Sequence, residues 1–207
     1  MDEYRTLRAP ASEAFTEKRS RFIGYARPVS TQAEAAAFLE EIRAKHHDAT
    51  HNVPAFRLRE GQLERCSDDG EPQGTAGLPV LDVLRKQAVI DCSVIVTRYF
   101  GGILLGAGGL VRAYSHAAAL ALGAAEIVTM ARCAILEVSC DYSFYGKLTL
   151  CIPEWGGIVE DTQFGAEIAI RIRIRAENAA LFCEKLTEAS NGRIQAVQTG
   201  ERFAAAD

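Results

Sequence analysis

The side chains best suited to chemistry in this sequence form an acidic cluster within a turn-rich segment. Ser67, Asp68, Asp69 and Glu71 are followed closely by Thr75 in the stretch CSDDGEPQGTAG. Carboxylates at this density could bind Mg²⁺ through their oxygens or act as general acids and bases. Asp and Ser also accept hydrogen bonds from nearby backbone N–H groups, which makes them common in turns. A structural or ion-pairing role and contact with a ligand both stay open, and we predict no catalytic metal site.

His51 and Asn52 begin the segment HNVPAF and add two polar side chains upstream of this cluster. A histidine near carboxylates can act as a base or as a ligand. We expect His51 to hydrogen-bond within a binding site and not to catalyse a reaction, and no G-x-S-x-G context marks Ser67 as a nucleophile. The alternative is an enzyme, a small-molecule phosphotransferase or hydrolase, that uses His51 with the acidic cluster.

A glycine-rich loop follows an apolar segment and opens a helix in the stretch TRYFGGILLGAGGLVRAYS. Backbone N–H groups at a helix N-terminus bind anions readily, and arginine adds bidentate hydrogen bonds to phosphate. The loop is not a Walker A motif, because no Gly-Lys-Ser/Thr follows, and its glycine spacing does not fit the dinucleotide-binding fingerprint. We predict a site for an RNA phosphate, a nucleotide or a partner's carboxylate, with tight helix–strand packing as the alternative. The residues assigned to it are Arg98, Tyr99, Gly101, Gly102, Gly106, Gly108, Gly109 and Arg112.

Composition limits the class of protein. The 207 residues carry a formal net charge of −4 and are 48% hydrophobic, as expected for one large or two small globular domains. This charge gives no whole-chain signature of a nucleic-acid binder, and a local basic patch stays open. The six cysteines include no C-x-x-C pair, so we expect reduced thiols and no zinc site. Without a signal peptide or a membrane-spanning run, we predict a soluble cytoplasmic protein with no membrane partner and no cofactor.

The first block of predicted elements lies between residues 13 and 122. Thr31 and Glu34 indicate a capping box, and the apolar residues after it recur at helical spacing. Pro54 favours a sheet edge or a bulge for its strand. The predicted order is two strands within 13–29 that turn near 18–20, a helix after 31, a strand at 51–58, a turn at Gly61, a strand at 62–67, a helix at 78–86, a strand at 94–100 and a helix at 109–122 stopped by Gly123.

A second block begins near residue 131. Isoleucine alternates with alanine or arginine over 168–175, which indicates a half-buried antiparallel strand. With the helices and strands predicted around it, the order βαββαβ is the ferredoxin-like arrangement. Arg171, Arg173 and Arg175 would share one sheet face, where they either pair with acidic neighbours such as Glu137 or Glu160 or follow phosphates. We place the two domains at 1–127 and 128–207 of an α+β protein.

The segments HNVPAF, SDDGEPQGTAGLPVL and TRYFGGILLGAGGLVRAYS strongly resemble the YigZ/Impact family over residues 18–122. The resemblance implies an N-terminal α/β sandwich with the fold of a ribosomal-protein domain that also occurs in elongation factor G. It also implies a C-terminal ferredoxin-like domain like the last domain of that factor. Eukaryotic Impact relatives regulate translation through protein partners, so the resemblance implies a translation-associated binding or regulatory protein. The expected partners are RNA, the ribosome, a translation-regulatory protein or a phosphate-bearing ligand, and the family supplies no settled reaction.

Overall fold

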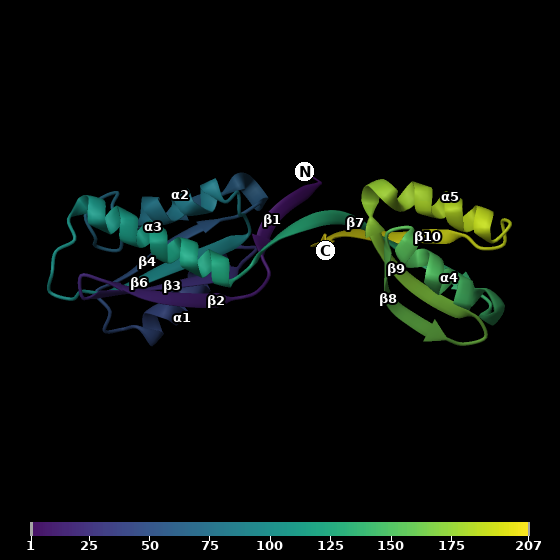
Figure 1. Ribbon diagram of the computed structural model, residues 1–207, viewed down its shortest axis with the longest axis horizontal. Coiled ribbons are helices and arrows are strands. Elements are labelled where there is room, and N and C mark those ends of the chain that lie inside the picture. The colour runs from purple at the N-terminus through teal and green to yellow at the C-terminus, as the bar shows by residue number, and fades with distance from the viewer. Residues whose placement is uncertain (1, 207) are drawn as a thin grey trace. The chain divides into compact units, whose positions relative to one another are not determined.

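The chain folds into two compact units in a computed structural model that describes residues 2–206 (Figure 1). The first unit comprises residues 4–129, and the second comprises residues 2–3 together with 130–206. Each unit contains an antiparallel sheet and its own apolar core. The predicted α+β class is therefore confirmed.

The first unit is built on a five-stranded sheet in the order β2-β3-β6-β4-β5. Lys18 and Arg19 form the tight turn of the β2–β3 hairpin with φ angles of 44° and 65°, as predicted for this segment. Strand β4 is neither the edge strand nor the bulge that Pro54 favoured, because it lies between β6 and β5 and its register with β6 is continuous. Pro54 is tolerated there because β5 pairs only with residues 55–57. The strands are β2 (Ala11–Glu17), β3 (Ser20–Pro28), β4 (His51–Arg57), β5 (Glu64–Cys66) and β6 (Cys92–Tyr99).

Helices cover both faces of this sheet (Figure 1). Helix α1 (Gln32–Lys45) lies on one face, and α2 (Gly77–Lys86) and α3 (Ala107–Ala124) lie on the other. The predicted cap of α1 is present, because Thr31 Oγ1 accepts the Glu34 N–H at 3.1 Å. Successive residues of β6 point to opposite faces, as in any strand. Ile95 accordingly packs towards α1, whereas Val94 and Val96 pack towards α2 and α3.

The end of α3 and the start of the first strand of the second sheet differ from the prediction. Gly123 does not stop the helix, which continues to Ala124, and β7 (Ile127–Cys140) begins three residues later and not near residue 131. Glu126, and not Gly123, adopts a left-handed conformation after the helix, with φ of 53°. Its carbonyl accepts the Arg8 N–H at 2.8 Å and its side chain pairs with the Arg8 guanidinium, and these contacts fix the turn at Glu126.

The second unit has the predicted βαββαβ order. In its sheet β8 pairs with β9 and β9 with β7, and β7 also pairs with β10 and with β1 (Glu3–Leu7). The predicted alternation over Ile168–Arg175 is confirmed, since all four isoleucines of β9 are at most 1% exposed. Its further elements are α4 (Tyr142–Glu154), β8 (Gly157–Phe164), β9 (Ile168–Arg175), α5 (Ala179–Ala189) and β10 (Ala196–Ala205). The sequence pattern did not predict β1 (Glu3–Leu7) or the short 3-10 helices η1 (Glu60–Gln62) and η2 (Ala176–Asn178). None of the described helices combines the length and the apolar character needed to cross a membrane.

Candidate functional site

A buried ion pair lies between the first sheet and helix α3. Glu71 Oε1 accepts hydrogen bonds from Arg98 Nη1 at 2.6 Å and from Tyr114 Oη at 2.8 Å. The Glu71 and Arg98 side chains are only 3% and 6% exposed. Burial, followed by the nearby Glu71 carboxylate, raises the pKa of Tyr114 well above its usual range, so its hydroxyl remains a hydrogen-bond donor. Two of these residues were predicted for the site, and Tyr114 was missed although it lies within the motif TRYFGGILLGAGGLVRAYS.

His51 completes this buried cluster. It is directly opposite Arg98 in the β4–β6 pairing, and its Nε2 lies 3.7 Å from Glu71 Oε1. Its Nδ1 lies 2.7 Å from the carbonyl oxygen of Asp69. Because a carbonyl can only accept, Nδ1 must carry a hydrogen. His51 is therefore a hydrogen-bonding residue held in one ring orientation, and Nε2 faces a carboxylate that two donors already occupy.

The Asp68 side chain hydrogen-bonds to the backbone at the start of helix α2. Its carboxylate accepts the N–H groups of Gly74, Ala76 and Gly77 at 2.8, 3.1 and 2.9 Å. Partial burial raises the pKa of Asp68, but these three backbone hydrogen bonds outweigh burial and the net shift is downward. Asp68 therefore caps the start of α2 from outside the helix. This is the structural role that the sequence left open for the residue, beside contact with a ligand.

Asp69 links the turn to strand β4 and helix α1. Its carboxylate accepts the Asn52 N–H at 2.7 Å and an Arg43 N–H at 2.8 Å. Ser67 Oγ accepts the Asp69 N–H at 3.2 Å, and Thr75 Oγ1 donates to a backbone carbonyl three residues earlier at 2.6 Å. Within residues 2–206, no group of three or more His, Cys, Asp or Glu side chains is arranged to hold a metal ion.

Tyr99 belongs to a separate hydrogen-bond network on the α1 face of the sheet. Tyr99 Oη donates to Asp48 at 3.0 Å and lies 2.8 Å from His46 Nδ1, while Tyr25 Oη lies 2.6 Å from His46 Nε2. Burial lowers the pKa of His46, which favours a neutral ring that donates to Tyr99 and accepts from Tyr25. Asn52 joins this network by donating to the His46 carbonyl at 3.3 Å. The sheet thus separates Tyr99 and Arg98, which the sequence had assigned to one site.

The glycine-rich loop combines tight packing with an open helix start. A Cβ on Gly101 would lie 2.1 Å from the backbone of Arg19, so this position needs glycine for close approach to the β2–β3 turn. Gly106 has φ of 74° and precedes α3 without any side-chain cap. Of the other predicted positions, Gly102 has φ of 80°, Gly109 packs on Leu105, and a Cβ on Gly108 would lie 3.6 Å from Arg112 Nη1.

Arg112 lies beside this helix start and faces a surface groove of 220 Å³. Within the described part of the chain, Arg112 has no hydrogen-bonding or ionic partner. Arg98, in contrast, is occupied by Glu71 and lies 3.4 Å from Ser20 Oγ. The expectation that both arginines reach one anion is therefore not supported by this geometry. The groove is lined by Phe15, Glu17, Lys18, Leu105, Gly109, Arg112, Ala113 and His116.

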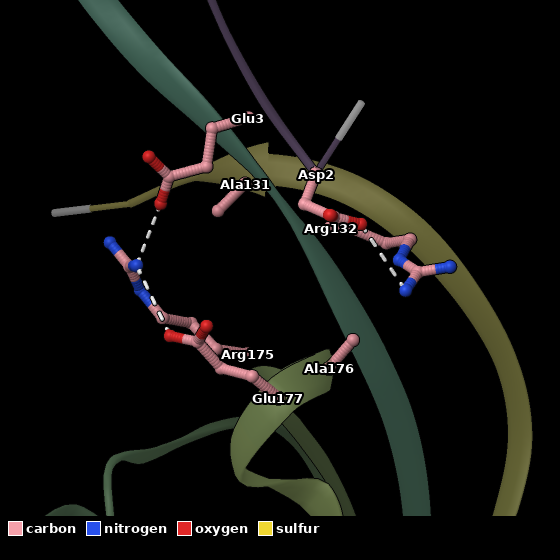
Figure 2. Close-up of a pocket in the computed structure, with 7 residues that line it drawn as sticks. All are labelled: Asp2, Glu3, Ala131, Arg132, Arg175, Ala176 and Glu177. Carbon is pink, nitrogen blue, oxygen red and sulfur yellow. Dashed lines mark hydrogen bonds and ion pairs between the residues drawn. The ribbon is translucent and has the colours of Figure 1, made fainter.

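The second unit also has a polar hollow, of 450 Å³, next to the first residues of the chain (Figure 2). Its two arginines are paired, Arg175 with Glu3 at 2.7 Å and Arg132 with Asp2 at 3.3 Å. On the same sheet, Arg171 pairs with Glu137 at 3.3 Å and Arg173 with Glu160 at 3.1 Å. Arg171 and Arg173 thus have the acidic partners on neighbouring strands that the sequence suggested. Because these ion pairs neutralise the arginines, less positive charge is available on this face to bind phosphates.

The comparisons with known proteins agree with the two-unit architecture. Residues 18–122 match the model of the Impact N-terminal domain, and residues 138–193 match a domain of unknown function, DUF1949. A crystal structure described only as that of a hypothetical protein is 32% identical, with a TM-score of 0.62, and the similarity covers 97% of this chain and 98% of that one. The fold and site therefore define a two-domain α+β protein with an Impact N-terminal domain.

Curated relatives extend over nearly the whole chain. IMPACT family member YvyE of Bacillus subtilis is 34% identical over 194 residues, which are 93% of this chain and 89% of that protein. IMPACT family member YigZ of Escherichia coli is 33% identical over 200 residues, which are 94% of this chain and 97% of that protein. Protein IMPACT-A of Xenopus tropicalis is 34% identical over 100 residues, 45% of this chain but 31% of that protein. The chain belongs to the IMPACT family.

Proposed function

We propose that this protein is a binding protein that acts in translation or its regulation and contacts RNA phosphates through the groove beside α3. The observation that carries the proposal is the unpartnered guanidinium of Arg112 next to an uncapped helix N-terminus. The N–H groups of the first helical turn and the helix dipole favour an anion at this end. Lys18 and His116 also line the groove, whereas its carboxylate is that of Glu17 alone.

The enzyme alternative receives less support from the geometry. A catalytic carboxylate needs an oxygen free to take a proton or hold a metal. Asp68 instead accepts three backbone N–H groups, Asp69 is shared between Asn52 and Arg43, and Glu71 lies buried against Arg98. These bonds account for the three side chains as structural groups, and no second function is proposed for them.

The proposal is tested by titrating labelled single-stranded RNA, and separately a labelled nucleotide, into the wild type and three variants at several salt concentrations. Arg112→Ala should weaken RNA binding and reduce the slope of log affinity against log salt by about 0.7 for the lost phosphate contact. Gly108→Val should weaken binding by placing methyl groups beside Arg112 and the open N–H groups. Arg65→Ala removes the same charge from β5, at the opposite edge of the sheet from β2, and should change little.

Circular dichroism of each variant is the control for folding. Equal RNA affinity and equal salt slopes for the wild type, Arg112→Ala and Gly108→Val would refute the groove as the RNA site. A separate pull-down of the wild type and Arg112→Ala from lysate, with and without ribonuclease, tests the connection with translation. We expect ribonuclease-sensitive recovery of ribosomal components by the wild type and reduced recovery by the variant.

A further inference from the structure

The exposed end of the buried cluster is the ring of Phe100. This residue follows Arg98 by two positions, and the Arg98 guanidinium carbon lies 5.4 Å from the centre of the Phe100 ring. A cation at this distance attracts an aromatic face. The Phe100 side chain remains 46% exposed although it lies next to a buried guanidinium. Its backbone N–H is fixed by Thr50 Oγ1 at 3.0 Å.

The guanidinium that contacts the ring is buried and hydrogen-bonded. Arg98 donates to Glu71 at 2.6 Å, Tyr114 donates to the same carboxylate oxygen at 2.8 Å, and His51 Nε2 lies 3.7 Å from that oxygen. The Arg98 guanidinium also lies 5.5 Å from the ring centre of the buried Phe22. An ion pair this deeply buried contributes little net stability, because desolvation offsets its attraction. What the ion pair does in this structure is hold the Arg98 guanidinium against the exposed ring of Phe100.

The surroundings of Phe100 are both basic and apolar. The backbone of Arg19 packs against Gly101, which brings the basic turn at Lys18 and Arg19 next to the loop. Ile103 and Leu104, further along the loop, are 40% and 82% exposed. A fixed aromatic ring next to positive charge is the combination that binds single-stranded nucleic acid, in which bases stack on aromatic side chains and cations contact the backbone.

Resting on the RNA function proposed above, we propose that Phe100 is a stacking platform for an unpaired base, so that the ligand class is single-stranded RNA. A duplex keeps its bases stacked on one another and cannot offer one to the ring without unpairing. The chain between Phe100 and Gly106 limits their separation to about 20 Å, so a few nucleotides suffice to connect a base on the ring to a phosphate in the groove.

The test compares affinities for a single-stranded RNA of about 12 nucleotides, an abasic strand of equal length and a duplex. Phe100→Leu keeps an apolar side chain but removes the aromatic face, and Phe100→Trp keeps a larger one. Phe100→Leu should bind single-stranded RNA about 5- to 150-fold more weakly with an unchanged salt slope, and Phe100→Trp should retain binding. Phe164→Leu replaces an aromatic residue that is 63% exposed in the second unit and should bind as the wild type does.

The abasic strand should bind the wild type and Phe100→Leu equally. Wild-type affinity of Phe100→Leu for single-stranded RNA, with binding still weakened by Arg112→Ala, would refute the platform and leave the phosphate site standing. No RNA binding by the wild type would refute the proposed function itself. Equal losses by Phe100→Leu for the duplex and the single strand would also overturn the inference, because the ring would then contact something other than an unpaired base.

Discussion

Replacing Glu71 with alanine would measure the cost of leaving the Arg98 charge buried and unpaired in the first unit. The Arg98 side chain is only 6% exposed, and the change leaves its guanidinium without an anion. It also removes the carboxylate that accepts the hydrogen bond of the Tyr114 hydroxyl. Breaking a buried pair from one side typically costs about 3–5 kcal/mol. For a unit of this size, such a loss lowers the melting temperature by about 10–20 °C.

The chain offers an internal control for this measurement. Its single tryptophan, Trp155, lies in the second unit and packs against Phe182. We expect the two units to unfold separately, because each has its own core. Tryptophan fluorescence during denaturation should therefore be unchanged by Glu71→Ala, while the part of the circular dichroism transition that belongs to the first unit moves to lower temperature.

Two further variants isolate the cause. Glu64 pairs with Arg57 and Arg85 near the surface, so Glu64→Ala should cost no more than about 1 kcal/mol. The double variant Glu71→Leu with Arg98→Met removes both charges and should recover most of the loss, because no unpaired charge remains buried. A cost for Glu71→Ala no larger than that for Glu64→Ala, or no recovery in the double variant, would refute the argument.

Two other outcomes follow from the turn and the loop. The lowered pKa of Asp68 means that its stabilisation is present above the unfolded value of about 3.9 and is lost as pH falls through the folded value. Asp68→Ala should thus cost about 1–2 kcal/mol at neutral pH. In a series of denaturation experiments at decreasing pH, the difference from wild type should begin to shrink below about pH 4 and vanish only below the folded pKa. Gly101→Ala should destabilise the first unit in thermal melts, because its Cβ would lie 2.1 Å from backbone, whereas Gly108→Ala meets only the end of a flexible arginine and should be tolerated. The reverse order of melting temperatures would contradict the packing argument.

Local patterns in the sequence were sufficient to predict most of the fold. The alternation over Ile168–Arg175 and the Thr31 cap each depend on residues close together in the chain, and both are confirmed. The end of α3 was wrong because the deciding partner, Arg8, lies more than a hundred residues from Glu126. Strand β1 escaped notice because its pairing with distant segments, and not its own short pattern, makes it a strand.

The candidate site shows the same limit. The residues of the site could be identified from sequence motifs, but they divide between the two faces of the first sheet. The division arises because successive side chains of β6 point to opposite faces, so that Arg98 contacts Glu71 and Tyr99 contacts His46. That alternation was available from the strand prediction and could have separated the two residues. The burial of Arg98 could not have been foreseen, since it requires Tyr114 and His51 to meet Glu71 from a helix and a neighbouring strand.

The assignment of residues 2–3 to the second unit has a topological consequence. The carbonyl of Asp2 accepts the N–H of Arg132, and Arg132 is the β-sheet partner of Phe203. Asp2 and Phe203 therefore lie on opposite sides of Arg132 in β7, each at about one strand spacing, roughly 4.8 Å, from it. The first unit is in effect an insertion within the second, entered after residue 3 and left at residue 130.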